Sequence, residues 1–343
     1  MNAALLHETE RLRRAWERHE VGFLHDYLVA GVEDPRRNLQ SVLTRHFLLT
    51  RLCGERFQAL RQHELRFAAA MNWLADTLGV EHDAELAGDL LFGLQRGADN
   101  VEGTELPHFA LELFGQLPAA VDGHTVPNYL ERYLANPAPA GNPALHTFQE
   151  LWSQVLAAEP PAAPKPTVVE PACGSANDYR FLAAFGLARL VDYAGFDLSE
   201  KNIANAQALF PGRRFAVGNV LAIAAPDRAF DCAIMHDLFE HLSAAALPVA
   251  VSELCRVTQD ALCVGCFGMD EIPEHIFRPM ADYHWNTLSL ARMKGLFSEH
   301  GFEVTAIHIG SYLNWLVGSP RTHNPNAYTL VMQRPGQGAS AGA

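Results

Sequence analysis

Residues 167–178 read TVVEPACGSAND, and this stretch decides how the chain folds. Its short apolar run ends at Glu170 and predicts a buried strand, and the small residues after it predict a tight turn into a helix near Asn177. A ligand that binds outside the carboxyl end of a strand needs a backbone that it can approach closely, which suits Gly174. The first turn of the helix offers free N–H groups to a carboxylate. We therefore expect a ligand-binding strand, turn and helix here.

Two more polar residues follow predicted strands further along the chain. Asp197 ends the run DYAGFD, and Ser199 stands where it can cap the next helix. An acidic side chain at a strand end can accept hydrogen bonds from both hydroxyl groups of a ribose. Asn219 follows Gly218 after the run RFAV, and its amide can both donate to and accept from the edge of an adenine. These positions predict a nucleoside site.

The chain changes character near its middle. Helical apolar spacing predicts helices over 37–52, 67–78 and 86–94 and after Asn142-Pro143, with no strand before residue 165. Beyond residue 166, short apolar runs alternate with helical stretches, which is typical of a parallel α/β sheet. The predicted strands are 167–170, 192–197, 214–217, 230–235, 261–267, 303–309 and 327–332, and the predicted helices between them are 205–210, 244–256 and 288–300.

These patterns divide the chain into parts. We expect an all-helical domain over residues 1–158 and a stiff proline-rich linker, EPPAAPKP, over 159–166. A second domain spans 167–334, and the tail 335–343 is expected to be flexible.

The motifs of the second domain resemble the class I methyltransferases, which use S-adenosylmethionine. Residues 170–176 match that family's acidic-x-Gly-x-Gly-x-Gly loop, Asp197 matches its ribose-binding acid, and Gly218-Asn219 matches its adenine-reading Gly-Asp. Residues 230–238 match its fourth strand, and 290–303 match the helix and strand that precede its reversed final strand. The resemblance covers about residues 165–334 and leaves the helical part unrecognised.

The resemblance implies an α/β fold, a Rossmann-like seven-stranded methyltransferase sheet with an N-terminal all-α domain. It implies an enzyme that converts S-adenosylmethionine to S-adenosylhomocysteine, with cofactor contacts from Glu170, Ala172, Gly174, Asp197, Leu198, Asn219, Val220 and His236. The loop departs from the family because Ala172 and Ala176 replace glycines, and an asparagine replaces the adenine-reading acid. Alanine disfavours positive φ. We expect cofactor binding to persist, with the pose of the methionine group left open.

Other families fit less well. A dinucleotide dehydrogenase needs G-x-G-x-x-G to seat a pyrophosphate, and this loop lacks that spacing. The adenine-N6 and glutamine methyltransferases carry a similar PACGSG loop, but their Asn-Pro-Pro-aromatic segment is replaced here by His236-Asp237-Leu238-Phe239. The loop alanines leave open a third reading, a binding protein without catalysis.

Methyl transfer is an in-line displacement in which the protein mainly supplies alignment and a dry pocket. A base is needed only when the nucleophile must lose a proton, and the candidates are His241, His284 and His236. Each of these could instead cap a helix or hold the core. The aromatic connection 269–286 is expected to form one wall of the acceptor site. Tyr129, Tyr133 and Trp152 are predicted to supply a lid or to pack the domain interface.

The segment Asp237-Leu238-Phe239-Glu240-His241 also resembles the Glu-x-x-Glu-His segment of ubiquinone-pathway O-methyltransferases, which is associated with a divalent metal. Similar segments occur in methyltransferases that need no metal, so we predict no metal site and activity that survives a chelator. The CxxC of Cys263 and Cys266 lacks the second pair that a zinc site needs, so we predict core residues.

The bulk composition limits the partners. The 343 residues carry a net charge of −13 without a cluster of Lys and Arg, which weighs against nucleic acid. We expect no membrane span, because no apolar run reaches about 18 residues, and a cytoplasmic location, because the first residues lack a signal-peptide core. The expected substrate is a small molecule methylated at oxygen or nitrogen, with secondary metabolism as one setting. In the alternative, the helical domain docks a partner protein. A homodimer is one option for the assembly.

Overall fold

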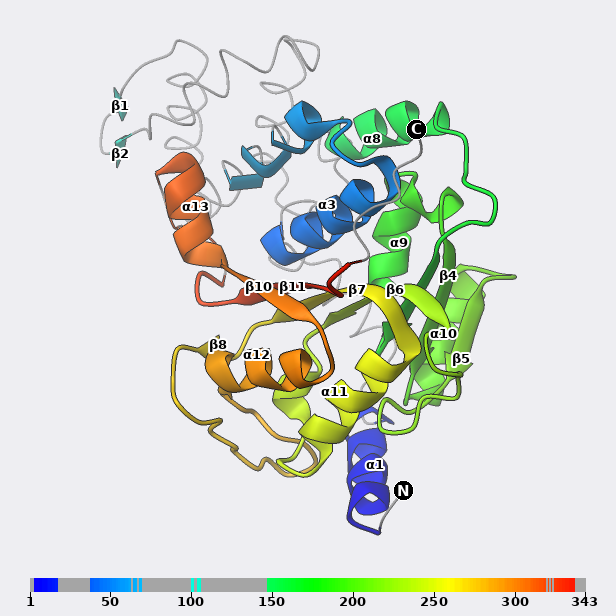
Figure 1. The fold of residues 1–343 in the computed structure, drawn as a ribbon, viewed down its shortest axis with the longest axis vertical. Coiled ribbons are helices and arrows are strands. Elements are labelled where there is room, and N and C mark those ends of the chain that lie inside the picture. The colour runs from blue at the N-terminus through cyan, green and yellow to red at the C-terminus, as the bar shows by residue number, and fades with distance from the viewer. Residues whose placement is uncertain are drawn as a thin grey trace.

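The computed structural model describes residues 3–17, 38–62, 64–66, 68–69, 100–101, 104–105, 147–318, 320, 322 and 324–336. Its centre is a sheet with helices on both sides (Figure 1). The sheet contains seven strands in the spatial order β10-β11-β7-β6-β3-β4-β5. Their bounds are β3 Thr167–Pro171, β4 Asp192–Asp197, β5 Arg214–Val217, β6 Phe230–His236, β7 Thr258–Cys266, β10 Glu303–His308 and β11 Tyr328–Gln333.

The directions of the strands show which edge of the sheet carries their carboxyl ends, and we call this the functional edge. Strands β5, β4, β3, β6 and β7 run parallel, and β11 runs antiparallel to both of its neighbours. The carboxyl ends of the five parallel strands therefore meet at one edge of the sheet, where ligands bind in such folds. The seven-stranded Rossmann-like sheet is confirmed, and each predicted strand is present within a few residues of its expected bounds.

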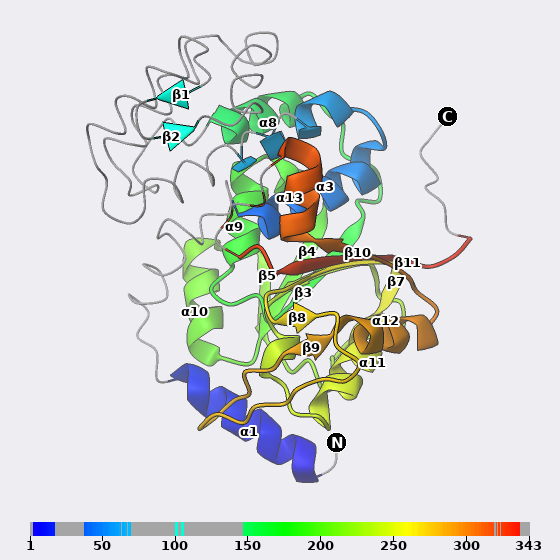
Figure 2. The same cartoon turned by 90° about the vertical axis from the view of Figure 1, so that its left-hand side faces the viewer.

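Helices cover both faces of this sheet, and each face has its own buried cluster. Figure 2 shows α3 and α13 above the sheet and α11 and α12 below it. The first cluster takes residues from α3 Leu39–Cys53, α8 Thr147–Ala157, α9 Asn177–Ala184, η5 Leu187–Arg189, α10 Glu200–Leu209 and α13 Ile309–Val317. The second takes residues from α1 Ala3–Glu17, η6 Phe239–His241, α11 Ala246–Val257 and α12 Leu290–Glu299.

Parts of the helical region are confirmed. Helix α3 begins at an Asn38 cap whose side chain accepts from Gln40 N and Ser41 N, and α8 follows where the sequence places it. Both helices pack into one buried cluster with strand residues such as Ile234 and Cys263. The division at 159–166 stays a prediction. Tyr129, Tyr133, the helix predicted over 86–94, most of that over 67–78 and the Asn142-Pro143 cap lie outside the described residues.

Three features differ from the sequence expectations. A two-residue antiparallel pair, β1 Asn100–Val101 with β2 Thr104–Glu105, contradicts the absence of strands before residue 165, and it is too short for an alternating pattern. The predicted strand 303–309 ends at His308, and it is followed by the helix α13, which the sequence did not predict and which the His308 side chain caps by accepting from Ser311 N. The connection 269–286 is folded back on itself, with β8 Met269–Asp270 beside β9 Leu288–Ser289 and bridges at Ile276–Thr287 and Pro279–His284.

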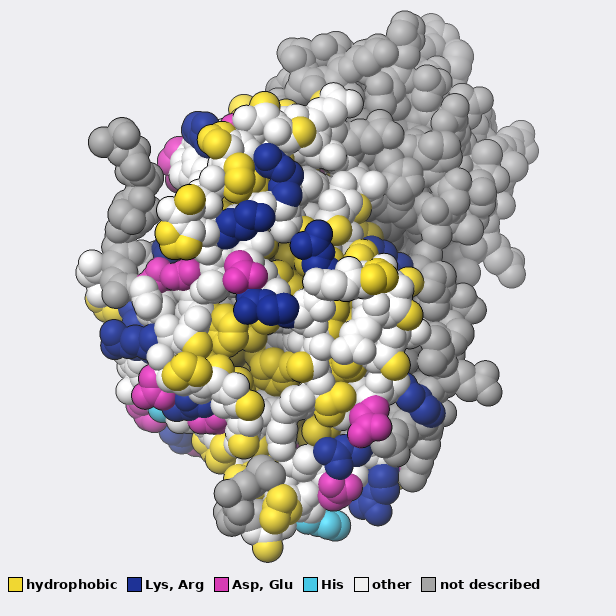
Figure 3. All heavy atoms as spheres, turned by 90° about the vertical axis from the view of Figure 1, so that its right-hand side faces the viewer, with side chains coloured by type: hydrophobic (Ala, Val, Ile, Leu, Met, Phe, Trp, Pro, Cys, Tyr) yellow, Lys and Arg dark blue, Asp and Glu magenta, His cyan; other side chains and the backbone are white. Residues whose placement is uncertain are grey.

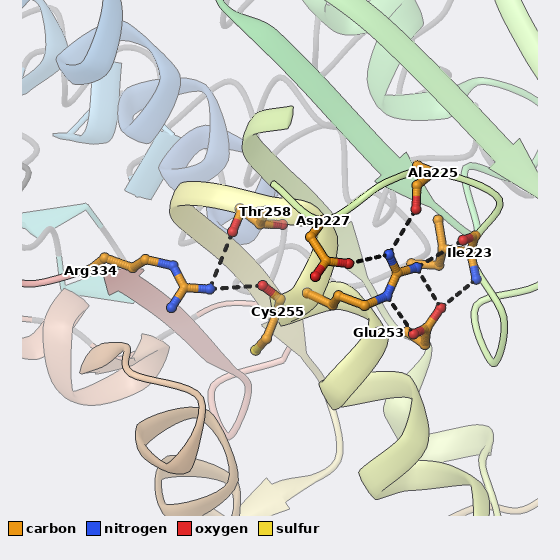
Figure 4. Close-up of polar contacts among 8 residues, drawn as sticks. Ile223, Ala225, Asp227, Glu253, Cys255, Thr258 and Arg334 are labelled. Atoms are coloured by element: carbon orange, nitrogen blue, oxygen red, sulfur yellow. Dashed lines mark hydrogen bonds and ion pairs between the residues drawn. The ribbon is translucent and has the colours of Figure 1, made fainter. Parts of the chain in front are cut away.

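Arginines fix the opposite edge of the sheet, where β7 begins (Figure 4). Arg256 donates to the carbonyl oxygens of Ile223 and Ala225, at 2.9 and 2.8 Å, and pairs with Glu253 and Asp227. Arg334 donates to the carbonyl oxygens of Cys255 and Thr258, at 2.9 and 3.4 Å. Arg334 thus satisfies a carbonyl group at the end of α11, and Arg256 satisfies two in the connection between β5 and β6.

The structure also shows the state of the cysteines and the length of the apolar helices. All six cysteines are free and buried, and Cys263 and Cys266 lie inside β7 as core residues. Among the described ranges, no helix is long and apolar enough to cross a membrane.

Candidate cofactor and acceptor site

The loop after β3 keeps a glycine-like path although two of its glycine positions hold alanine. The φ angles are 56° at Ala172, 53° at Gly174 and 66° at Ala176. Alanine is therefore found in the left-handed region that we expect it to avoid, at a cost of about 1–2 kcal/mol per residue. Hydrogen bonds hold the loop there: Cys173 N donates to Phe196 O at 3.1 Å, and Gly174 N donates to Asp197 Oδ2 at 3.0 Å.

Asp197 is the residue that joins this loop to the next strand end. Its Oδ1 accepts from Ser199 N at 2.8 Å and from Asn202 Nδ2 at 3.2 Å, in addition to the Gly174 bond on Oδ2. Burial raises the pKa of this carboxyl, while these hydrogen bonds lower it. A carboxylate offers about four acceptor positions, so room remains for a ribose hydroxyl.

The start of α9 also has unused polar groups. Its N-cap residue, Ala176, provides no side-chain hydrogen bond to the first-turn N–H groups. The amide oxygen of Asn177 is buried and has no hydrogen-bond partner in the described structure. A buried polar atom without a partner is uncommon and invites a polar ligand group. These groups fit the charged methionine end of S-adenosylmethionine. The sequence indicated Asn177 only as the start of a helix.

The amide of Asn219 is held by the protein itself. Its Nδ2 donates to Thr9 Oγ1 of α1 at 3.0 Å, and its Oδ1 accepts from Leu221 N at 2.9 Å. Val220 is buried in the second cluster, and Leu198 packs against that cluster. Helix α1 thus lies beside the predicted adenine region, which no sequence pattern indicated. Adenine reading by Asn219 stays a prediction.

A chain of buried polar side chains runs under the cofactor loop. Tyr193 donates to Glu170, whose pKa is raised well above its usual value by burial and by Asp178. Asp178 Oδ2 accepts from His236 Nδ1 at 2.8 Å, and the other ring nitrogen, Nε2, lies 2.8 Å from Thr44 Oγ1 of α3.

This chain fixes the state of His236. Burial alone would lower the pKa of His236, but Asp178 outweighs it and raises that pKa to about 9. The ring is therefore an imidazolium at neutral pH, with both nitrogens engaged. Such a ring has no lone pair with which to accept a proton. The sequence could not indicate Thr44 or Asp178, since both partners come from other elements. A cofactor contact of His236 stays a prediction.

His241 is neutral, in contrast to His236. Its Nδ1 lies 3.0 Å from the carbonyl oxygen of His284, which can only accept, so Nδ1 carries a proton. Burial lowers the pKa of His241, which keeps the ring neutral. Nε2 then holds a lone pair, and the structure shows no partner for it among the described residues.

His284 has the other tautomer. Its Nδ1 lies 2.8 Å from Nη2 of Arg11, and because a guanidinium group only donates, Nδ1 is the acceptor. The proton of the neutral ring is then on Nε2. Burial and the charge of Arg11 both lower the pKa of His284. This histidine can donate a hydrogen bond, but in this state it cannot take up a proton.

Glu240 and Trp152, the remaining candidates for a metal ligand and a lid, are both buried. Glu240 is fully buried, accepts from Gly268 N at 3.2 Å, and has a pKa raised to about 8 by burial and by Asp237. In the described ranges, no three His, Cys, Asp or Glu side chains are grouped to hold a metal ion. Trp152 is 1% exposed and donates to Glu64 Oε2 at 2.7 Å, so it packs the core and does not form a lid.

Comparisons with known proteins agree with this fold. Residues 168–261 match the family model of a methyltransferase domain. A search of curated proteins found no match.

Solved structures with a similar arrangement include three methyltransferases. One is an S-adenosylmethionine-dependent methyltransferase from Mesorhizobium loti, with 14% identity, a TM-score of 0.39, and coverage of 53% of this chain and 96% of that one. Another is a putative methyltransferase in complex with the Trm112 activator of Haloferax volcanii, with 18% identity, a TM-score of 0.38, and coverage of 54% and 89%. The third is the magnesium protoporphyrin IX methyltransferase of Synechocystis PCC 6803 with bound S-adenosylmethionine, with 18% identity, a TM-score of 0.36, and coverage of 54% and 79%.

The family match covers β3 to the start of β7, and the sheet has the strand order of that fold. Both agree with the loop after β3 and the acid that ends β4. Residues 168–261 are a methyltransferase domain with the class I sheet around them, and the chain is an S-adenosylmethionine-dependent methyltransferase.

Proposed function

We propose that the protein methylates an oxygen or nitrogen atom of a small molecule and that His241 is the base. The observation that carries this proposal is the hydrogen bond from His241 Nδ1 to the carbonyl oxygen of His284, at 3.0 Å. This bond leaves the Nε2 lone pair available on a neutral ring. His241 follows β6, which neighbours β3, so it stands at the edge of the sheet that also carries the cofactor loop.

The cofactor would be held by three groups at that edge. Asp197 would accept from a ribose hydroxyl, the Gly174 loop would allow close approach of the backbone, and the first turn of α9 with Asn177 Oδ1 would bind the methionine end. When bound, S-adenosylmethionine supplies an activated methyl group on a sulfonium. The protein therefore needs to align the acceptor, exclude water and remove one proton.

His241 removes that proton at Nε2. The acceptor atom gains the methyl group, the electron pair of the broken carbon–sulfur bond stays on sulfur, and the acceptor proton passes to Nε2. The carbonyl oxygen of His284 accepts from Nδ1 and stabilises the imidazolium that forms. His284 in turn is oriented by Arg11 of α1.

The distribution of charge disfavours nucleic acid as the acceptor. The face in Figure 3 carries side chains of both charges around a hydrophobic centre. A nucleic-acid site would instead gather Lys and Arg, and the whole chain has a net charge of −13.

The test is the substitution His241→Gln, with turnover followed as S-adenosylhomocysteine release over a panel of small phenols and amines. We expect kcat to fall by about 10²–10⁴-fold while affinity for S-adenosylhomocysteine is unchanged, because the lost interaction belongs to proton transfer. In the wild type, kcat should rise with pH through an inflection below the ordinary histidine pKa, because the base must be neutral. The variant should lose this inflection.

His7→Gln is the matched control, because His7 is exposed on α1. It should keep both the rate and the pH profile. Full activity in His241→Gln would remove the base and leave alignment as the only catalytic contribution of the protein.

A further inference from the structure

Three aromatic rings, Phe267, Tyr283 and Trp285, meet beside the candidate base, and we call them the aromatic platform. The ring of His241 lies 5.6 Å from Phe267, 5.5 Å from Tyr283 and 5.7 Å from Trp285, measured between centroids. Phe267 and Trp285 are 4.9 Å apart. These separations are those of rings in direct contact.

The platform belongs to the functional edge of the sheet. His241 follows β6, Phe267 follows β7, and Tyr283 and Trp285 come from the folded connection between β8 and β9. Strand β6 lies between β7 and β3, so the platform and the cofactor loop share one edge.

The platform is also open. Trp285 is 49% exposed, and the same connection carries Met280 and Ile276 at 49% and 44%. Large apolar side chains gathered in one exposed place indicate a binding surface. Because the rings are in contact with one another, a ligand would stack on their exposed faces.

Polar groups around the platform select the ligand. The Nε2 lone pair of His241 suits a group that can give up a proton. Arg11 is bonded to His284 at 2.8 Å and also pairs with Glu8 at 3.4 Å, so its charge is balanced and the choice of ligand falls to the rings and to His241. An aromatic ring with an acidic hydroxyl suits both.

We propose that the aromatic platform binds the ring of a phenolic acceptor whose hydroxyl faces His241 Nε2. This inference rests on the proposed function and names its substrate class. The phenol O–H bond breaks and its proton passes to Nε2. The phenol oxygen takes the methyl group, and S-adenosylhomocysteine leaves with the sulfur electron pair.

The test is calorimetric binding of 2-naphthol to the full chain saturated with S-adenosylhomocysteine. Decahydro-2-naphthol has the same carbon skeleton without aromatic rings, and tetramethylammonium represents a cationic ligand. We expect 2-naphthol to bind at least about tenfold more tightly than either, because stacking requires a π system. Trp285→Ala should weaken 2-naphthol binding by about tenfold, and Trp285→Phe should restore most of it.

Trp315→Ala is the matched control, because Trp315 is 77% exposed on α13, outside the platform. It should leave 2-naphthol binding unchanged. Equal binding of the saturated alcohol, tighter binding of tetramethylammonium, or indifference to Trp285 would each overturn the inference. A chain that binds S-adenosylhomocysteine but not 2-naphthol also overturns it and leaves the proposed function standing. A chain that binds neither contradicts both.

Discussion

Individual residues of the cofactor loop carry backbone strain. Ala172 and Ala176 have positive φ, which glycine adopts without penalty. The loop pattern was readable from the sequence because small residues after a strand are informative. The strain was not, since side-chain type alone does not show which backbone region the hydrogen bonds of Gly174 and Cys173 impose.

We predict that Ala172→Gly raises the free energy of unfolding by about 0.5–1 kcal/mol, since relief of strain exceeds the added entropy of the unfolded chain. Urea denaturation measures this change. Ala183→Gly is the control, because Ala183 lies within α9 and glycine there should destabilise by about 1 kcal/mol. Equal destabilisation by both variants would contradict the strained loop.

The sequence predicts where the candidate histidines lie but does not predict their protonation states. Their positions after predicted strands were evident, but their protonation states depend on partners distant in the chain. Thr44 and Asp178 fix His236, and Arg11 fixes His284. No local pattern joins α1 or α3 to these rings.

Secondary-structure elements are joined by a buried charge network between α3 and α8. Glu64 is 1% exposed and accepts from Arg45 at 2.8 Å, and it pairs with His46 at 2.6 Å. Trp152 of α8 donates to the same carboxylate at 2.7 Å. Although burial opposes it, Arg45 and His46 lower the pKa of Glu64 to about 2.

We predict that Glu64→Gln lowers the free energy of unfolding at pH 7 by about 3 kcal/mol, because the buried guanidinium group of Arg45 loses its carboxylate partner. The folded pKa lies below the unfolded one, so the wild type should lose this stability as pH falls from about 4.5 towards 2. Chemical denaturation at several pH values measures both effects. Glu55→Gln, at a side chain 76% exposed, should change little. A similar loss in both variants would contradict the network.

At the scale of the whole molecule, the sheet could be predicted from the sequence, but the packing of α1 and α3 could not. Apolar runs alternating with helices predicted the sheet, because a parallel sheet buried on both faces leaves a simple pattern. The packing of α3 against β7 and β11 and of α1 beside Asn219 left no such pattern, since one apolar helix face fits many partners.

We propose that the segment 159–166, exposed over 160–165, divides the chain, and limited proteolysis with a broad-specificity protease tests this. An early cut should fall there, and a second in 269–286 should slow when S-adenosylhomocysteine binds. The cut pieces should stay together, because α3 and α8 share a core with the sheet. A first cut inside α3 would contradict this division.

We propose that the carboxyl ends of β3 and β4 hold S-adenosylmethionine, and calorimetric titration with S-adenosylhomocysteine tests this placement. The wild type should bind one ligand per chain. Asp197→Asn should weaken binding by about 1–3 kcal/mol, because a charge-assisted hydrogen bond to the ribose is lost. Asp192→Asn, at the exposed amino end of the same strand, should bind like the wild type. Absence of binding by the folded wild type, or equal affinity in all three proteins, would contradict the claim.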